Sequence, residues 1–479
     1  MLDNSQADVS SAAKKLLKDG KLLETTEALA FKVSNKYDFA RRFAREYSLI
    51  LAGQTIKYLN VGQLDRAYSH VGLYAPPGLG KDYAWKLVQT SGIFPTDVFR
   101  VKKIENVTEA ALAGTITEST LIPPPTVTED ILFVGEYATL VRGNIATAIS
   151  ADLRAILESG EYSRRVAKIG RLKEIIHTQP SSPQAKYVQE QIREYKKLGM
   201  TIDLTKCEIN VKTTTSWIVS SAKFGSETYY GRSLLNMGDV NRYRWLSYVP
   251  TREERLRITS EVGSLPPVTI SAQEKKVCRE AWAVLVKGLR TNIVEIPRDS
   301  QSYYERQRIW DDTQKTLMDT YRDEMANDIY FNQLVNMRTR AEFTRLMYQH
   351  AVLKQYERDQ GYDFTQPHKF IIDYKEDGEF AKQLWISEYV PSMIDVIKDV
   401  LSHQNTKVKS TRETLTAKGE AIVIERLKKG PAKREELIKI VKGKASITSY
   451  LLDNRILRKL IAQGTIVRDR FGWYSLTVD

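Results

Sequence analysis

The spacing of apolar residues changes along the chain, and each change predicts a different kind of structure. Up to residue 68, apolar positions recur at helical spacing, for example over 12–17 and 39–44, so 1–68 is predicted to be a helical N-terminal segment. Over 69–262, short apolar runs alternate with helical stretches, the pattern of an α/β core with a parallel sheet. Over 263–406 the helical spacing returns without strands, which predicts an all-helical lid. The runs expected to be strands are 71–74, 98–101, 130–134 and 216–220.

Longer stretches with helical periodicity are expected to be single helices. The charged insertion 171–206, which holds a helical run at 185–198, has two interpretations. It is either a solvated helical hairpin or a segment that faces a DNA channel. An acidic, Gly-containing turn at 373–379 is expected to precede the last helix of the lid. The predicted helices are 151–168, 272–289, 302–325, 331–356 and 381–401.

The C-terminal residues predict a compact unit of their own. Residues 407–415 are polar and basic, which is typical of a linker. Within 416–479, three helices are expected at 416–428, 433–442 and 446–463, each ended by Gly or Gly-Pro. Two short strands are expected at 466–469 and 473–478. Three helices followed by a β-hairpin form a winged helix, a variant of the helix-turn-helix.

Composition and charge point to a globular protein with a polyanionic partner. Hydrophobic residues make up 42% of the chain and charged residues 27%, and the net charge is +13. Residues 416–479 hold fourteen Lys and Arg against seven Asp and Glu, so this unit carries more than half of the excess. We therefore expect DNA to be the partner, although a winged helix can also serve protein–protein contact. The expected DNA contacts are Thr448, Ser449, Tyr450, Asn454, Arg455, Arg458 and Lys459 on the third helix, and Arg468 and Arg470 on the wing.

The cysteines and the N-terminus exclude some classes of protein. The two cysteines, Cys207 and Cys278, are far apart, so a structural zinc site is not expected. So few cysteines fit a reducing cytoplasm. The N-terminus is polar and no apolar run follows it, so we expect neither a signal peptide nor a membrane span.

The strongest chemical signal lies in residues 72–85. Strand 71–74 cannot continue through the Pro/Gly-rich turn that follows it, and Lys81 then opens a helical segment. This order predicts a phosphate-binding loop, in which backbone N–H groups and a helix N-terminus surround an anion while the Lys reaches the outer phosphates. The usual pattern is G-x-x-x-x-G-K-[ST]. The alternative is an ordinary turn before a helix. The loop residues are Ala75, Pro76, Pro77, Gly78, Leu79, Gly80, Lys81 and Asp82.

A second feature follows the third strand candidate, which ends in Gly135 and Glu136. In ATPases with such a loop, an apolar strand ends in an acidic pair: the Asp helps to hold Mg²⁺ and the Glu polarises the attacking water. Gly135 stands where the Asp is expected. Glu136 remains at the carboxyl end of the strand, where ligands of α/β proteins bind. The alternative is a solvated carboxylate at a strand end.

Taken in order, these motifs resemble those of AAA+ ATPases, and among them the minichromosome maintenance (MCM) helicases and their relatives on mobile elements. The resemblance covers roughly residues 60–479. The winged helix and the loop 75–82 fit it, and Leu157-Glu158 through 165–170 is similar to the segment after the second motif. Residues 216–225 lie where sensor 1 is expected. Leu234-Leu235 with 241–243 is similar to the arginine-finger region, and Arg338 with 345–351 has the spacing of the sensor 2 helix.

The resemblance implies a ring, usually hexameric, that binds ATP and Mg²⁺ between subunits and works on DNA with other replication proteins. Lys81 and Glu136 would act from one subunit, Arg242 would act across the interface as the arginine finger, and Arg338 would be sensor 2. The family usually carries an N-terminal DNA-binding domain, and we do not expect one within the roughly 70 residues that precede the loop, which hold no suitable cysteines. The sensor 1 Asn is replaced by Ala222, which leaves Ser221 or Ser220 as substitutes.

The residues expected at the metal depart further from the pattern, because Asp82 replaces a Ser or Thr and Gly135 replaces the Asp. One hypothesis is a swap, in which the carboxylate moves from strand to loop and Asp82 faces Mg²⁺.

Three functions follow from the motifs. The first is an MCM-like, DNA-dependent ATPase or initiator of replication. The second is a catalytically weak or inactive DNA-binding assembly factor. The third is a MoxR-like AAA+ chaperone, against which the basic winged helix argues.

Overall fold

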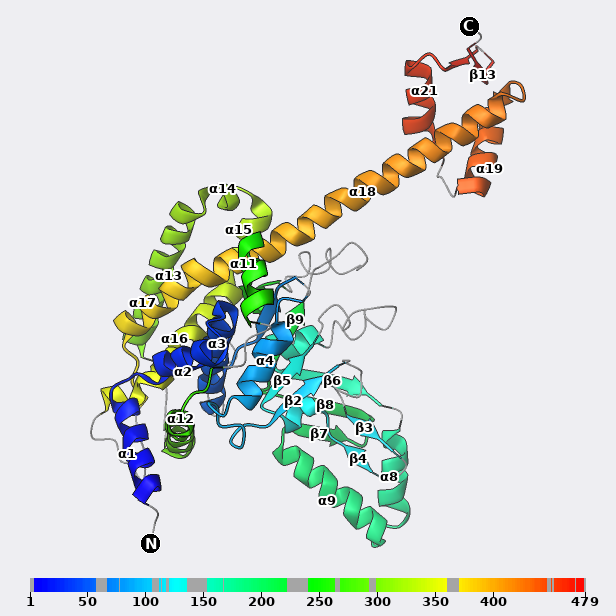
Figure 1. Cartoon of the computed structure of the whole chain (residues 1–479). Coiled ribbons are helices and arrows are strands. Elements are labelled where there is room, and N and C mark those ends of the chain that lie inside the picture. Colours follow the sequence, from blue (N-terminus) through cyan, green and yellow to red (C-terminus); the bar gives the residue numbers. More distant parts are fainter. Residues whose placement is uncertain are drawn as a thin grey trace. The chain divides into compact units, whose positions relative to one another are not determined.

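The computed structural model (Figure 1) divides the chain into two compact units, Met1–Val400 and Leu401–Asp479. Each unit is described by itself. The structure describes residues 4–56, 67–76, 78–105, 112, 114–117, 120–135, 153–166, 168–221, 240–262, 268–292, 299–359, 370–445, 449, 452–469 and 471–477.

A five-stranded parallel sheet forms the centre of the first unit, and it confirms the predicted α/β core. The strand order is β10-β1-β9-β5-β2, and every neighbouring pair is parallel. Strands β1, β5, β9 and β10 are buried along their whole length, as the apolar runs require. The predicted strand 98–101 is wrong in position: β2 begins at Val101, because the Val98 N–H donates to the Pro95 carbonyl and closes a turn before the strand. The strands are β1 (Val71–Tyr74), β2 (Val101–Ile104), β5 (Ile131–Val134), β9 (Ser216–Ser221) and β10 (Arg244–Ser247).

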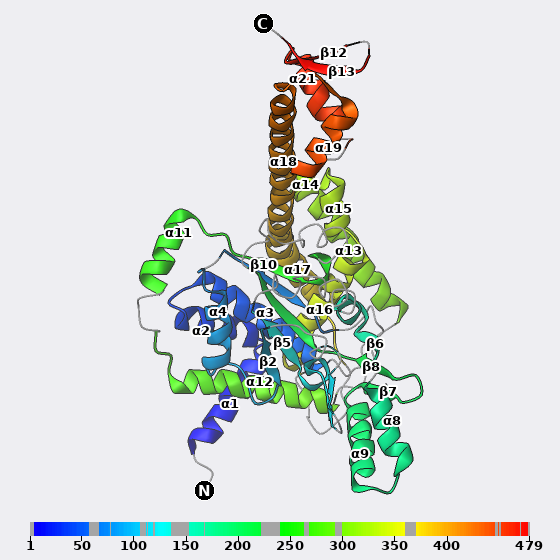
Figure 2. The ribbon, with the colours of Figure 1, turned by 90° about the vertical axis from the view of Figure 1, so that its right-hand side faces the viewer.

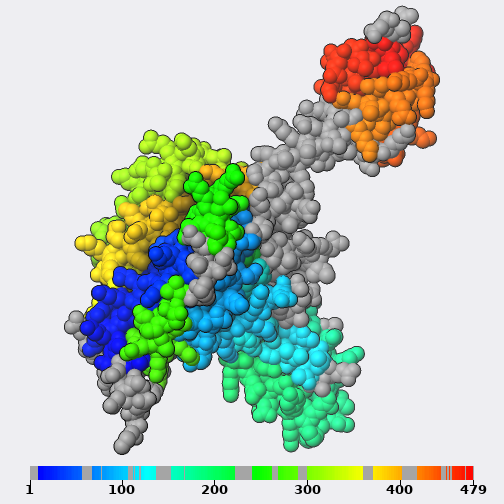
Figure 3. Space-filling model, viewed as in Figure 1, coloured from blue at the N-terminus to red at the C-terminus, as the bar shows by residue number. Residues whose placement is uncertain are grey.

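Residues 4–56 of the N-terminal segment are helical, as predicted, and they pack in the core. Helix α4 (Lys81–Thr90) lies on the sheet, where the Trp85 ring stacks on Phe133 at 4.2 Å. Tyr47 of α3 packs edge-on against Trp85, so α3 covers α4 in turn. The indole N–H of Trp282 donates to the Thr26 hydroxyl, which joins α2 to α12 (Ala272–Asn292). Figure 3 shows the N-terminal helices and α12 in contact at the surface. These helices are α1 (Asn4–Lys18), α2 (Leu22–Val33) and α3 (Asp38–Thr55).

A smaller antiparallel sheet, of order β6-β8-β7, follows β5, and α8 and α9 pack together beside it (Figure 2). The expected helix 151–168 is wrong in its second half. Residues 153–159 are helical, but Gly160 ends the helix at a φ of +71° and β6 begins. The insertion 171–206 contains the expected helical pair and, in addition, strand β7. The elements are β6 (Glu161–Arg165), α8 (Ile169–Thr178), α9 (Pro183–Lys197), β7 (Met200–Asp203) and β8 (Glu208–Lys212), with β3 (Thr115–Ile116), β4 (Leu121–Ile122) and α6 (Pro125–Thr128) before β5.

The remaining helices of the first unit are shorter than predicted. The expected helix 331–356 is two helices, because Asn336 begins a new one with a capping box shared with Thr339. The expected turn at 373–379 is wrong as well: the Asp373 side chain caps α17, so the acidic residues form its first turn. The helices are α11 (Arg252–Arg257), α13 (Ser300–Thr320), α14 (Arg322–Met325), α15 (Asp328–Leu334), α16 (Met337–Arg358) and α17 (Tyr374–Leu384), with π-helical turns at Ile258–Val262 and Trp385–Tyr389.

Helix α18 (Val390–Leu427) continues from the first unit into the second. The predicted linker 407–415 and the predicted helix 416–428, up to Leu427, therefore lie within α18. The predicted helix 381–401 joins α18 only from Val390 onward, because its first residues belong to α17 and to the π-helical turn Trp385–Tyr389. The second unit has its own apolar core, formed around Val423, Leu437, Ile456 and Tyr474. Its three-stranded sheet has the antiparallel order β11-β13-β12, so it holds one more strand than the predicted hairpin. The expected helix 446–463 is described at 449, in a π-helical turn (Leu452–Leu457) and in α21. The elements are α19 (Arg434–Ala445), α21 (Arg458–Ala462), β11 (Ala432–Lys433), β12 (Ile466–Arg468) and β13 (Trp473–Leu476).

Candidate functional site

The predicted phosphate loop connects β1 to α4. Both Gly78 and Gly80 have positive φ angles, +78° and +76°, so the turn depends on residues without a side chain. Gly80 is the N-cap of α4, and its carbonyl accepts the Ala84 N–H at 2.8 Å. The loop is anchored to the sheet at its start, where the Ala75 N–H donates to the Ser221 carbonyl at 3.2 Å. Pro76 is half-buried, and Pro77 lies outside the described residues.

Lys81 reaches back across this loop. Its side chain is 9% exposed and its Nζ donates to the Ala75 carbonyl at 2.8 Å, six residues earlier. A buried ammonium group beside a helix N-terminus creates a strongly positive site. Loop, helix terminus and Lys81 can therefore bind an anionic group such as a phosphate.

The N-terminal segment holds the loop in place through Tyr37. The Tyr37 hydroxyl donates to the Leu79 carbonyl, and the Tyr37 ring packs 3.2 Å from the Cβ position of Gly80. Because C=O and N–H point in opposite directions across a trans peptide, this bond turns the Gly80 N–H away from Tyr37. Tyr248 packs edge-on against Tyr37 and stacks on Phe39, which fixes the ring. Burial raises the pKa of Tyr37, so the hydroxyl keeps its proton. Sequence reasoning missed Tyr37, because nothing local links it to a loop 42 residues later.

The loop lies at the topological switch point of the sheet, where the connections after neighbouring strands run in opposite directions. After β1 the chain crosses to β2 at one edge, and after β9 it crosses to β10 at the other. The crevice between the carboxyl ends of β1 and β9 is therefore the expected ligand position in such a sheet. Ser221, predicted as a sensor 1 substitute, ends β9 there. The hydroxyls of Ser220 and Ser221 are fully buried, and neither has a hydrogen-bond partner among the described residues.

The positions expected to serve a metal lie next to this loop. Asp82 is in the first turn of α4, with a side chain that is 78% exposed and an Oδ1 that lies 4.0 Å from Nζ of Lys103 on β2. Gly135 follows β5, and a Cβ built on it would lie 3.4 Å from Cε of Lys103. Lys103 therefore lies close to both positions, which sequence reasoning did not foresee. Glu136 lies outside the described residues.

The two predicted arginines come together on one carboxylate. Arg242 donates from Nη2 to Oε2 of Glu158 at 3.1 Å, and Arg338 donates from Nη2 to Oε1 at 2.5 Å. Partial burial favours the neutral acid, but hydrogen bonds from Arg338 and Arg242 lower the pKa of Glu158 below its usual value. Arg242 is only 7% exposed, so in this conformation its side chain is buried within the first unit. The sequence suggested both arginines but not the carboxylate that joins them.

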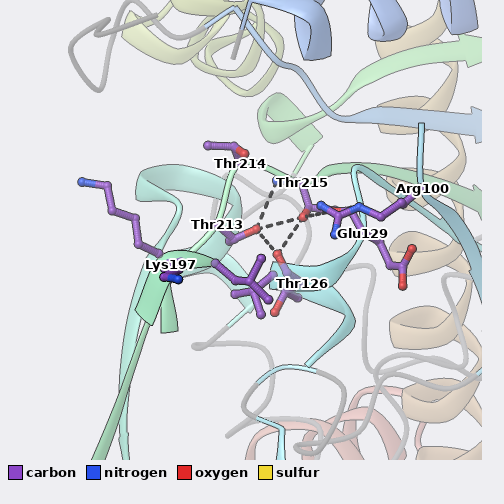
Figure 4. Close-up of a pocket in the computed structure, with 10 residues that line it drawn as sticks. Arg100, Thr126, Glu129, Lys197, Thr213, Thr214 and Thr215 are labelled. Carbon is purple, nitrogen blue, oxygen red and sulfur yellow. Dashed lines mark hydrogen bonds between the residues drawn. The ribbon is translucent and has the colours of Figure 1, made fainter. Parts of the chain in front are cut away.

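A pocket of about 90 Å³ lies at the ends of the strands that are opposite to the phosphate loop (Figure 4). Arg100 precedes β2, Glu129 precedes β5, and Thr213–Thr215 precede β9, so the pocket lies at the amino ends of the strands. The Thr215 hydroxyl donates to the Thr126 and Glu129 carbonyls, both at 2.7 Å, and the Thr213 hydroxyl also donates to the Thr126 carbonyl. These threonines therefore connect the segment before β9 to the segment before β5. The pocket that they line does not include the phosphate loop.

The second unit carries the residues predicted to contact DNA. Ser449, Arg458, Lys459 and Arg468 are exposed. Lys459 donates to both carboxylate oxygens of Glu420, at 2.8 and 2.9 Å, and Arg468 lies 5.6 Å from the ring of Tyr474. The remaining candidates are less well described: Asn454 and Arg455 belong to the π-helical turn Leu452–Leu457, and Thr448, Tyr450 and Arg470 lie outside the described residues.

None of the helices in the described part of the chain is both long enough and apolar enough to cross a bilayer. A scan against protein-family models and a search of curated protein sequences found no match to this chain.

Proposed function

We propose that this protein is an ATP-binding, DNA-binding ATPase of the AAA+ type, similar to the MCM helicases. The observation that carries the proposal is the loop 75–81, which joins a central parallel strand to a helix at the switch point of the sheet. Its glycines have positive φ angles and its lysine is buried among backbone groups. A triphosphate fits these properties because backbone N–H groups and an ammonium group would share its charge.

The arginine pair supports the same proposal. Glu158 holds Arg242 and Arg338 side by side, 96 residues apart in the chain. Guanidinium groups stabilise the charge that develops during phosphoryl transfer. Arg338 would act on the nucleotide of its own subunit. Arg242 would act across the interface of a ring, and it would have to leave Glu158 to do so.

The residues at the metal positions fit Mg²⁺ poorly. Mg²⁺ prefers carboxylate and water oxygens in a tight octahedral shell. Gly135 offers no side chain, and the one carboxylate described there, Asp82, lies beside the Lys103 ammonium group. The roles proposed above therefore include no step at a metal ion. This misfit favours a second candidate function, an assembly factor that binds ATP and DNA but hydrolyses ATP slowly or not at all.

The second unit supports DNA as the partner. Helix α18, α19 and the helical segment that ends with α21 alternate with a three-stranded antiparallel sheet, the order of elements in a winged helix. The surplus of seven positive charges in its residues 416–479 favours contact with phosphates. Among the predicted contacts whose side chains the structure describes, Arg458 and Arg468 are exposed guanidinium groups.

ATP hydrolysis and strand unwinding, each with and without DNA, test the proposal. The variants are Lys81→Ala and Glu136→Gln, and Lys86→Ala, an exposed lysine on the same helix, is the matched control. The proposal predicts DNA-stimulated hydrolysis that both site variants lose and the control keeps. ATP and DNA binding without turnover selects the assembly factor. Absence of ATP binding in the native protein refutes both.

A further inference from the structure

Lys103 lies on the face of the sheet that α4 covers. It is paired in register with Phe133 of the neighbouring parallel strand, so the two side chains share a face. The Trp85 ring of α4 stacks on Phe133 at 4.2 Å, which identifies that face as the one beneath α4. The Lys103 side chain therefore extends beside the first turn of α4, next to the phosphate loop. Its neighbour Lys102 belongs to the opposite face and is exposed.

The ammonium group of Lys103 lies between the two positions that serve the metal in ATPases of the proposed type. Its Nζ is 4.0 Å from Oδ1 of Asp82, and it is 3.8 Å from the Cβ position of Gly135. A carboxylate side chain at 135 would occupy the space next to the lysine. Gly135 and Lys103 are therefore complementary: the residue without a side chain leaves room for the long one.

The Lys103 side chain is 48% exposed and lies beside Asp82. An ammonium group and a divalent cation at this one small site repel each other, because both are positively charged. Lysine is a compact point charge with three donors, and it can bind phosphate oxygens directly. Asp82 then has a different role from a metal ligand: its carboxylate attracts the Lys103 ammonium group from a distance of 4.0 Å.

We propose that Lys103 replaces the divalent cation at this site, so that the outer phosphates of ATP are held by Lys81 and Lys103 without a metal ion. The inference rests on the proposed nucleotide site and specifies what that site requires. It also replaces the hypothesis that Asp82 is a swapped Mg²⁺ ligand. A site of this kind binds ATP equally well in the presence and absence of Mg²⁺.

The test is the affinity for a fluorescent ATP analogue, measured by anisotropy in Mg²⁺ and in excess EDTA. Native protein should show a dissociation constant that differs by less than about threefold between the two conditions. Lys103→Met should bind the analogue in EDTA about tenfold more weakly or worse, as expected when a charge-assisted contact is lost. Lys102→Met on the opposite face is the matched control and should bind like the native protein. Thermal melting of all variants checks that they are folded.

A second variant tests whether the requirement for Mg²⁺ can be restored. Lys103→Met combined with Gly135→Asp removes the ammonium group and restores the usual carboxylate, so its affinity should become dependent on Mg²⁺. Native binding that disappears in EDTA overturns the proposal, and so does Lys103→Met binding in EDTA with native affinity. Native protein that binds no nucleotide in either condition refutes the proposed nucleotide site itself, which is a different result.

Discussion

A buried ion pair, Glu46 with Arg244, joins the N-terminal segment to the sheet, and its removal is expected to destabilise the first unit strongly. Nη2 of Arg244 lies 3.2 Å from Oε2 of Glu46, and neither side chain is exposed. Gln349 accepts from Nη1 of Arg244 at 2.6 Å, and the Tyr389 hydroxyl donates to Glu46. Burial opposes the charged guanidinium group, but Glu46 keeps the pKa of Arg244 above its usual value.

The substitution Glu46→Gln keeps the shape of the side chain and an acceptor for Tyr389, but it leaves the Arg244 charge buried without its carboxylate. Loss of one partner of a buried pair costs about 3–5 kcal/mol. The matched control is Asp97→Asn, which breaks a 2.8 Å contact to Arg279 between exposed groups. Such a surface pair contributes only about 0–1 kcal/mol. Adding Arg244→Met to Glu46→Gln should recover part of the loss, because no uncompensated charge remains.

Urea unfolding followed by tryptophan fluorescence measures this difference. Six of the seven tryptophans lie in the first unit, so the signal reports chiefly on its unfolding. The free energy of unfolding should fall by several kcal/mol for Glu46→Gln and by under about 1 kcal/mol for Asp97→Asn. Equal losses for the two variants would refute the reasoning, as would a double variant less stable than Glu46→Gln alone.

Three further predictions concern the loop, the arginine pair and the thiols. Tyr37→Phe keeps the ring but removes the bond to Leu79, so ATP affinity should fall roughly 2–10-fold, while Tyr83→Phe nearby leaves it unchanged. Because hydrogen bonds from Arg338 and Arg242 lower the pKa of Glu158, its charge stabilises the fold above the unfolded pKa, and this contribution is lost as the pH falls through the folded pKa. Glu158→Gln should therefore reduce the melting temperature at neutral pH and match the native protein in strong acid. Burial raises the pKa of the Cys278 thiol to about 11, so a thiol reagent should label only Cys207 in the native state and both cysteines after unfolding.

The sequence pattern predicts those parts of the fold that depend on local signals. Strands β1, β5 and β9 are short apolar runs between turn residues, and they form within a residue of the predicted positions. The predicted position of β2 is wrong because two lysines occupy the centre of this strand, so it lacks the apolar run that marks the other strands. The helix expected at 151–168 ends early for a similar reason: Gly160 acts as a helix end, and β6 is specified by its pairing with β8.

The candidate site was only partly predictable, because some of its contacts join distant segments. Loop 75–82 is predictable from its glycines and its lysine. Tyr37 and Lys103 carry no local signal, and each becomes relevant only when the fold brings it to the loop. Glu158 belongs to a motif of the resemblance, but its contact with the two arginines is visible only in the fold. The sequence predicts a linker within α18 because residues 407–415 are polar. A helical stretch without an apolar face has the same polar composition as a linker, so the pattern does not distinguish the two.

The central claim is that the loop between β1 and α4 binds the phosphates of ATP. Calorimetric titration of ATP into native protein and into Lys81→Ala tests it most directly, with Lys86→Ala as the control on the same helix. We expect one binding event in the native protein and in the control, and an affinity at least about tenfold weaker in Lys81→Ala, whose folding is checked by thermal melting. Native affinity in Lys81→Ala would contradict it.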